Sequence, residues 1–164
     1  MVAVVTRQNS VQRGPVDDNC SDWTALPAGV EPTDAFSGAA PYAIRDVTLR
    51  ANEQHSAPVA GKNCLGCHDG SGHAPKFDFA GTIYTSTAGS KGAANTEVRI
   101  VREDNYYVSV HSDEDGNFWH KGQTTPPKGS LAGVRNGNGA FIGHLNGAAC
   151  NSCHTSSSNR LYIK

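Results

Sequence analysis

The pattern Cys-x-x-Cys-His occurs twice in this chain, as CLGCH at residues 64–68 and as CNSCH at residues 150–154. Two thiols separated by two residues can each form a thioether with one vinyl group of the same porphyrin, and the following histidine can then bind the iron. The spacing is therefore a chemical requirement of covalent haem attachment. We expect two covalently bound haem c groups, attached through Cys64, Cys67, Cys150 and Cys153, with the irons bound by His68 and His154.

A structural zinc site is the main alternative, because two Cys-x-x-Cys pairs could supply four thiolates. Zinc ribbons usually separate their pairs by roughly 15 to 20 residues, whereas Cys67 and Cys150 lie much further apart in this sequence. Zinc would also leave the histidine after each second cysteine unexplained. A thioredoxin-like redox motif requires a single Cys-x-x-Cys in a βαβ setting, and the sequence has no such pattern.

The second axial ligand decides whether a haem iron is closed or open to small molecules. The only methionine is Met1, so we expect histidine on both faces of each iron, which also implies low reduction potentials. A lone histidine is more often a surface or hydrogen-bonding residue than a ligand. A weak internal repeat favours His55 and His144, because each precedes a Gly-x-x-Cys step that opens a motif. The candidates, in order of preference, are His144, His55, His111, His73 and His120.

The middle of the chain has the alternation of β-strands. The segments FDFAGTIYT from Phe77, TEVRIVRE, and YYVSVHSDEDGNFWHKG predict strands, with a tight turn in the last of them. The Asp115-Gly116 step can supply the positive φ of that turn, and Phe118 would return the chain to the core. Residues 77–124 resemble the small immunoglobulin-like module of carboxypeptidase regulatory domains, in which a DADGNF-type turn closes the last hairpin.

Asp113 and Asp115, with Gly116 after them, also imitate part of a calcium-binding loop. The bidentate glutamate that completes such a loop is missing at the required spacing. We therefore expect a turn with solvated carboxylates.

These features predict a mainly β fold with large irregular, loop-rich haem-binding segments, in which a small immunoglobulin-like β-sandwich is flanked by the two haem motifs. The four parts are an extended arm (1–50), a first haem-binding segment (51–76), the β-module (77–124) and a second, Gly/Asn-rich haem-binding segment (125–164) that could add an edge strand at its end. The arm either wraps its own haem pocket or lies across a neighbouring subunit. Its Cys20 is either buried and inert or forms an intermolecular disulfide.

The whole chain resembles secreted multihaem cytochromes of bacteria that pass electrons outside the cell, a family with members that polymerise into filaments called cytochrome nanowires. This resemblance implies an electron carrier rather than an enzyme. Its partners would be other copies of itself and redox donors and acceptors, either proteins or extracellular acceptors. The alternatives are a dihaem peroxidase and a haem sensor, both of which need one open iron site.

Charge and hydropathy limit the remaining partners. The formal net charge is −1, which supplies no field to attract nucleic acid or an anionic membrane. No run of residues approaches the roughly 18 apolar residues of a transmembrane helix, so we expect no membrane insertion. Haem attachment in this cytochrome class takes place outside the cytoplasmic membrane, which implies a periplasmic or extracellular location and a leader that this numbering does not show.

Overall fold

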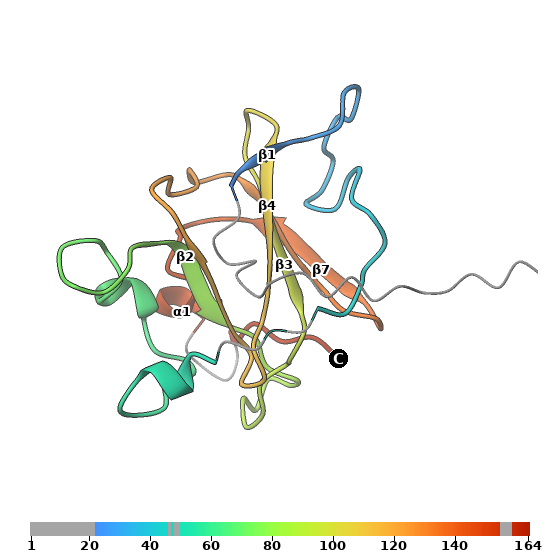
Figure 1. Cartoon of the computed structure of the whole chain (residues 1–164). Helices are drawn as coiled ribbons and strands as arrows, with labels where there is room; N and C mark the ends of the chain where they lie inside the picture. Colours follow the sequence, from blue (N-terminus) through green and yellow to red (C-terminus); the bar gives the residue numbers. More distant parts are fainter. Residues whose placement is uncertain (1–21, 46, 48–49, 155–158) are drawn as a thin grey trace, which may run out of the picture.

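The computed structural model of the protein describes residues 22–45, 47, 50–154 and 159–164 (Figure 1). Within these residues the fold is mainly β, with two antiparallel sheets and only short helical turns. The prediction of a mainly β fold is therefore confirmed. No helix in the described part of the chain is long and apolar enough to cross a membrane.

The larger sheet, sheet A, has the strand order β1-β4-β3-β6-β7 in the described residues. Its strands are β1 (Thr24–Ala25), β4 (Tyr106–His111), β3 (Glu97–Val101), β6 (Leu131–Arg135) and β7 (Ala140–His144). Side chains alternate between its two faces. Val98 and Ile100 of β3 point to the inner face, and Glu97 and Arg99 point to the outer face.

Sheet B pairs β2 (Phe77–Thr82) with β5 (Asn117–Lys121). Its inner residues Phe79 and Phe118 pack against the inner valines and isoleucine of sheet A in one buried cluster. The two sheets therefore enclose the hydrophobic core between them, in the manner of a β-sandwich. A second, smaller cluster of Phe77, Ala80 and Trp119 covers the other face of sheet B.

The tight turn expected between β4 and β5 is present. The Gly116 amide donates to the Asp113 carbonyl at 3.0 Å, and Gly116 has φ of +81°. The Phe118 side chain returns to the core, as expected. The two strands do not form a hairpin with each other, however, because β4 enters sheet A and β5 enters sheet B. The turn thus carries the chain from one layer to the other.

The carboxylate of Asp113 is buried rather than solvated, which corrects that expectation. It accepts hydrogen bonds from the backbone amides of Asp115 and Asn117 in its own turn, and from the amide of Ala51 at 2.8 Å. The desolvation of this carboxyl raises its pKa, and these hydrogen bonds oppose the increase. Asp113 therefore fixes the turn and attaches the start of the first motif-bearing segment to it.

The segment expected to be a Gly/Asn-rich loop contains two strands. Strands β6 and β7 pair with each other, and β6 pairs along the whole of β3. Near the end of the chain, Tyr162 forms only an isolated bridge with Tyr84 instead of an edge strand. The β structure thus continues past residue 124, almost to the second motif.

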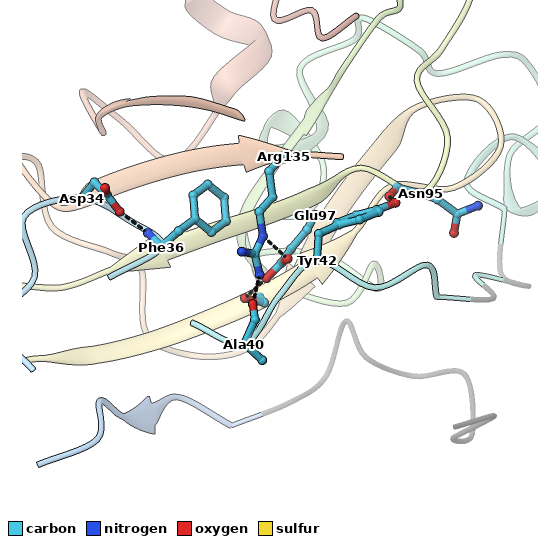
Figure 2. Close-up of polar contacts among 8 residues, drawn as sticks. Asp34, Phe36, Ala40, Tyr42, Asn95, Glu97 and Arg135 are labelled. Atoms are coloured by element: carbon cyan, nitrogen blue, oxygen red, sulfur yellow. Dashed lines mark hydrogen bonds and ion pairs between the residues drawn. The ribbon is translucent and has the colours of Figure 1, made fainter. Parts of the chain in front are cut away.

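The arm contributes strand β1 to sheet A, and its residues 34–42 then lie across the outer face of that sheet (Figure 2). Phe36 packs on Gly133, where an added Cβ would stand 2.5 Å from the Phe36 ring. The Tyr42 hydroxyl donates to the carbonyl oxygen of Asn95 at 2.7 Å, and Arg135 donates to the carbonyl oxygen of Ala40 at 2.7 Å. These contacts attach the described part of the arm to sheet A of its own chain. Cys20 lies outside the described residues.

Candidate haem-binding sites

The two Cys-x-x-Cys-His motifs form short helical turns beside strand β2. The first motif contains the 3₁₀ turn η3 (Cys64–Gly66), and the second contains the single turn α1 (Cys150–Cys153) (Figure 1). In both motifs the histidine amide donates to the carbonyl oxygen of the first cysteine, at 3.0 Å in one and 2.9 Å in the other. The same local geometry therefore brings two thiols and an imidazole to one side of each turn.

The first motif opens onto a cavity of about 550 Å³. Cys64, Cys67 and His68 line it, together with His55 from the preceding segment and apolar side chains of β2 and β5. The His68 ring is buried and stacks on Phe77, with ring centroids 3.9 Å apart. The structure thus brings together every group expected at the first site, and His55 as well.

The second motif opens onto a separate cavity of about 280 Å³ on the inner side of β6 and β7. Cys150, Cys153 and His154 line it, and so does His144, the last residue of β7. Because His144 pairs with Leu131, its side chain leaves β7 on the outer face of sheet A, opposite to Phe141. His144 therefore borders this cavity at the end of β7 without pointing to its floor.

Four histidines share one hydrogen-bonding arrangement. The Nδ1 atoms of His68, His154, His55 and His144 each lie within hydrogen-bond distance of a backbone carbonyl oxygen, from Pro75, Asn159, Ala51 and Gly129 respectively. A carbonyl can only accept, so Nδ1 must carry the proton and donate it. In the neutral ring, Nε2 then keeps its lone pair, which is the tautomer that a metal ligand requires.

The remaining histidines are placed elsewhere. His111 lies on the outer face of sheet A beneath the arm, and His73 is exposed in the loop after the first motif. His120 is buried between the sheets, where its Nδ1 lies 3.0 Å from a carboxylate oxygen of Asp78. Among the described residues, the structure thus brings only His55 and His144, the two preferred candidates, to the cavities that hold the motifs.

The cysteines differ in exposure within each pair. Cys67 and Cys153 are exposed, whereas Cys64 and Cys150 are partly buried. Burial raises the pKa of Cys64, and it raises the pKa of Cys150 to about 12, with a smaller contribution from Cys64 nearby. The first thiol of each motif is therefore neutral at physiological pH, and these two thiols lie close to each other.

A polar cluster that sequence reasoning missed connects the two motifs. Asn151, between the cysteines of the second motif, is 1% exposed, and its amide donates to the carbonyl oxygen of Lys62 at 2.8 Å. Its side-chain oxygen accepts from the amide of Thr82 in β2. The Thr82 hydroxyl in turn accepts from the amide of Gly61. No sequence signal identifies Asn151, because it occupies a variable position of the pattern.

In the described residues, no three or more His, Cys, Asp or Glu side chains converge where one metal ion could be held. A four-thiolate zinc site needs such convergence, whereas a haem iron takes one or two protein ligands. Comparisons with protein-family models, curated proteins and solved structures found no match to this chain. The function is therefore argued from the geometry of the two sites.

Proposed function

We propose that this chain is a dihaem c-type cytochrome that carries electrons. The observation that carries the proposal is the repeated composition of the two cavities. Each is lined by the two cysteines and the histidine of one motif, and one further histidine borders each of them. Bound haem would supply a reversible one-electron couple at each site.

Histidine ligation on both faces of each iron is part of the proposal. At the first site the ring centroids of His55 and His68 are 5.9 Å apart. Two imidazoles bound to one metal, with metal–nitrogen bonds of about 2 Å, would have centroids roughly 6 Å apart. His55 and His68 are thus spaced like two ligands of a single iron. The backbone carbonyls that bond to Nδ1 hold both rings with Nε2 available.

The apolar lining of the first cavity supports the same assignment. Phe77, Phe118 and Trp119 from sheet B form much of its wall. Such side chains exclude water from a porphyrin and gain hydrophobic stabilisation when they cover it. Besides the two histidines, the polar lining residues are Gln54, Asn63, Asn117, Lys62 and Lys121. The two lysines can stay near solvent while their stems cover apolar surface.

The two sites share a wall, which supports electron exchange between them. Phe118 lines both cavities. Gly81 of β2 lies directly behind this wall, because a Cβ at Gly81 would stand 2.7 Å from the Phe118 ring and 2.8 Å from the Cβ of Cys150. The backbone of β2 therefore approaches the second motif as closely as a glycine allows, and the β-layers hold the two motifs at a fixed separation.

The second site is the more open one, and we propose it as the place where electrons enter or leave the protein. Its cavity, of about 280 Å³, is about half the size of the first and lies below the usual range of small-molecule sites, so a porphyrin bound there would extend beyond it into solvent. Phe141 and Ile142, beside it, are 61% and 55% exposed. A partly exposed cofactor edge there would be accessible to a redox partner, whereas the first site is more enclosed.

The remaining parts of the proposal follow from the resemblance to secreted multihaem cytochromes. They are a periplasmic or extracellular location, an immunoglobulin-like identity for the β-module, and assembly of copies into filaments. The observed contacts of the arm with its own sheet remove one reason for expecting filaments. Negative-stain microscopy of the purified protein tests assembly directly, and particles of a single compact size would contradict it.

The central test is production of the chain with and without each motif in a host that attaches c-type haem. Intact-mass measurement should find two haems on the wild type, one on the Cys64→Ala/Cys67→Ala variant and one on the Cys150→Ala/Cys153→Ala variant. The Cys20→Ser variant is the matched control and should retain two. Low-spin ferric signals from both sites in electron paramagnetic resonance would support bis-histidine ligation. A colourless wild-type protein would refute the proposal.

A further inference from the structure

The face of sheet A that lies away from the motifs carries a cleft of about 370 Å³ beneath the arm. This volume lies within the usual range of small-molecule sites, about 300 to 1,000 Å³. The arm forms the roof with small residues, which are Gly38, Ala39, Ala40, Pro41 and Ala43. The floor is formed by charged and polar side chains on the outer face of β3, β4 and β6.

The roof is held at a fixed height above the floor. Arg135 of β6 donates to the Ala40 carbonyl oxygen at 2.7 Å, and its guanidinium stands over the Phe36 ring at 4.5 Å (Figure 2). Further along the arm, the Tyr42 hydroxyl donates to the carbonyl oxygen of Asn95. The cleft is thus a built feature, with its roof tied to the sheet at two points.

Among the described residues, Glu97 provides the only carboxylate on the cleft floor, and this carboxylate already has an ion-pair partner. One oxygen of Glu97 accepts from the Nε of Arg135 at 2.7 Å, and the other accepts from the Ser109 hydroxyl at 2.9 Å. Both partners lie on the strands that flank β3, so Glu97 is committed to holding the sheet face together. Glu97 is therefore not an acceptor for the Nε of Arg99.

Arg99 is the unusual group of this cleft. It is only 5% exposed, and its Nε has no hydrogen-bond partner among the described residues. Its guanidinium stacks on the Tyr107 ring, 3.6 Å from the centroid. Burial lowers the pKa of Arg99, and the nearby Arg135 acts in the same direction, while Tyr107 and Glu97 oppose it. A buried guanidinium with an unused donor favours an anion that can accept from it.

We propose that this cleft binds a small anion bearing a carboxylate or a phosphate, with Arg99 as its principal ligand. Three arginines, Arg45, Arg99 and Arg135, line the cleft against two carboxylates, Asp22 and Glu97. The planar guanidinium of Arg99, fixed by Tyr107, presents its donors in the fork that matches either oxyanion. This inference is independent of the haem proposal, because no motif residue lines the cleft.

The test is isothermal titration calorimetry of the purified full-length protein with inorganic phosphate and, separately, with succinate. We expect at least one of the two to bind with an affinity that falls as salt concentration rises. The relative affinities for the two probes distinguish a phosphate site from a carboxylate site. If neither phosphate nor succinate binds at concentrations of about 10 millimolar, the proposal is overturned.

Two variants and a control assign the binding to this cleft. Arg99→Met keeps an unbranched, flexible stem without the charge and should weaken binding at least tenfold. Ala43→Trp fills the cleft from the exposed roof, leaves every charge in place and should also abolish binding, which covers the case in which Arg99→Met does not fold. Arg102→Met removes an arginine near the same strand, outside the cleft, and should change affinity less than twofold. An equal loss in the control would refute the site.

Discussion

The side-chain amide of Asn151, in the second motif, donates a hydrogen bond to the carbonyl oxygen of Lys62, just before the first motif, at 2.8 Å. One buried side chain therefore connects two cysteine pairs that are far apart in sequence. Because Asn151 also bonds to Thr82 of β2 through both its oxygen and its nitrogen, the two motifs and the strand behind them form one hydrogen-bonded unit.

Substitution of Asn151 by alanine should destabilise this unit. The change leaves the Thr82 amide and the Lys62 carbonyl without their partner, at about 1 to 3 kcal/mol for each buried group. We expect urea unfolding to show a loss of about 2 to 4 kcal/mol. Ser152→Ala is the matched control, because the Ser152 hydroxyl bonds only within its own exposed turn, and it should stay within about 0.5 kcal/mol of the wild type. Equal effects of the two changes would contradict the bridging role.

The distal histidines provide the second prediction. His55→Ala and His144→Ala should each convert one of the two haem sites from low-spin to high-spin and allow carbon monoxide to bind there, because the sixth ligand is lost. Optical and electron paramagnetic resonance spectra measure both effects. His73→Ala is the control, since His73 is exposed and lines neither cavity. A fully low-spin spectrum for either test variant would remove that histidine as a ligand.

The chemistry of the two motifs stays a prediction, which rests on the spacing that a porphyrin requires. Sequence reasoning reached the central strands because the alternation of β3 between two faces is a local pattern. It missed β6 and β7 because Gly133 and Gly143, inside these strands, read as loop signals. Position 133 must be a glycine, because the Phe36 ring of the arm occupies the space that a side chain there would need.

The cleft and the Asn151 bridge could not be predicted for a related reason. Both depend on contacts between residues far apart in the chain, such as Arg135 with Ala40. The polar residues of β3 indicate a face in contact with water, and nothing in their pattern indicates that the arm covers it. The preference for His55 and His144 as ligands rested on a weak repeat and stays a prediction; both residues line the cavities that hold the motifs.

Gly81 provides the third prediction, because it allows the closest approach between sheet B and the second motif. Gly81→Ala would press a methyl group against Phe118 and the Cys150 Cβ, at a cost of about 1 to 3 kcal/mol. The Soret circular dichroism of the two sites should change together, since Phe118 lines both. Gly139→Ala, where nothing lies within 4 Å of the added Cβ and which lines neither cavity, is the control and should leave the spectrum unchanged. A change confined to one site would contradict the shared wall.

The thiols provide the fourth prediction, a pH dependence in the chain prepared without haem. The pKa of Cys150 is raised from 9.0 to about 12, so folding lowers its thiolate fraction at pH 8 roughly a thousandfold. Alkylation followed by mass spectrometry should modify the exposed Cys67 and Cys153 first. The reactivity of Cys150 should rise only as the pH approaches 12 or as urea unfolds the chain. Rapid modification of Cys150 at pH 8 in the folded chain would contradict its burial.

The same alkylating reagent gives a complementary result on the protein with haem attached. With both haems attached, the four motif sulfurs are thioethers and cannot be alkylated. Denatured holoprotein should therefore show one reactive thiol, that of Cys20, or none before reduction if Cys20 forms an intermolecular disulfide. Five reactive thiols would show that no haem is attached.

The unequal enclosure of the two sites leads to the last prediction, a difference in reduction potential. The first cavity is larger, and Lys62 and Lys121 line it, whereas no lysine or arginine of the described residues lines the second. Low dielectric and nearby positive charge both favour the reduced iron, which carries one positive charge fewer. The first site should therefore have the higher potential, by an amount on the order of tens of millivolts.

Spectroelectrochemical titration of the two single-motif variants, Cys64→Ala/Cys67→Ala and Cys150→Ala/Cys153→Ala, assigns each potential to its site. Lys121→Met in the variant that keeps the first haem should lower its potential, because one of the two positive charges is removed. The same change in the variant that keeps only the second haem is the control and should have little effect, since Lys121 does not line that cavity. A higher potential at the second site would show that solvent exposure and lysine charge do not set the order of the two potentials. Electrons would then enter and leave the protein by a route other than the exposed second site.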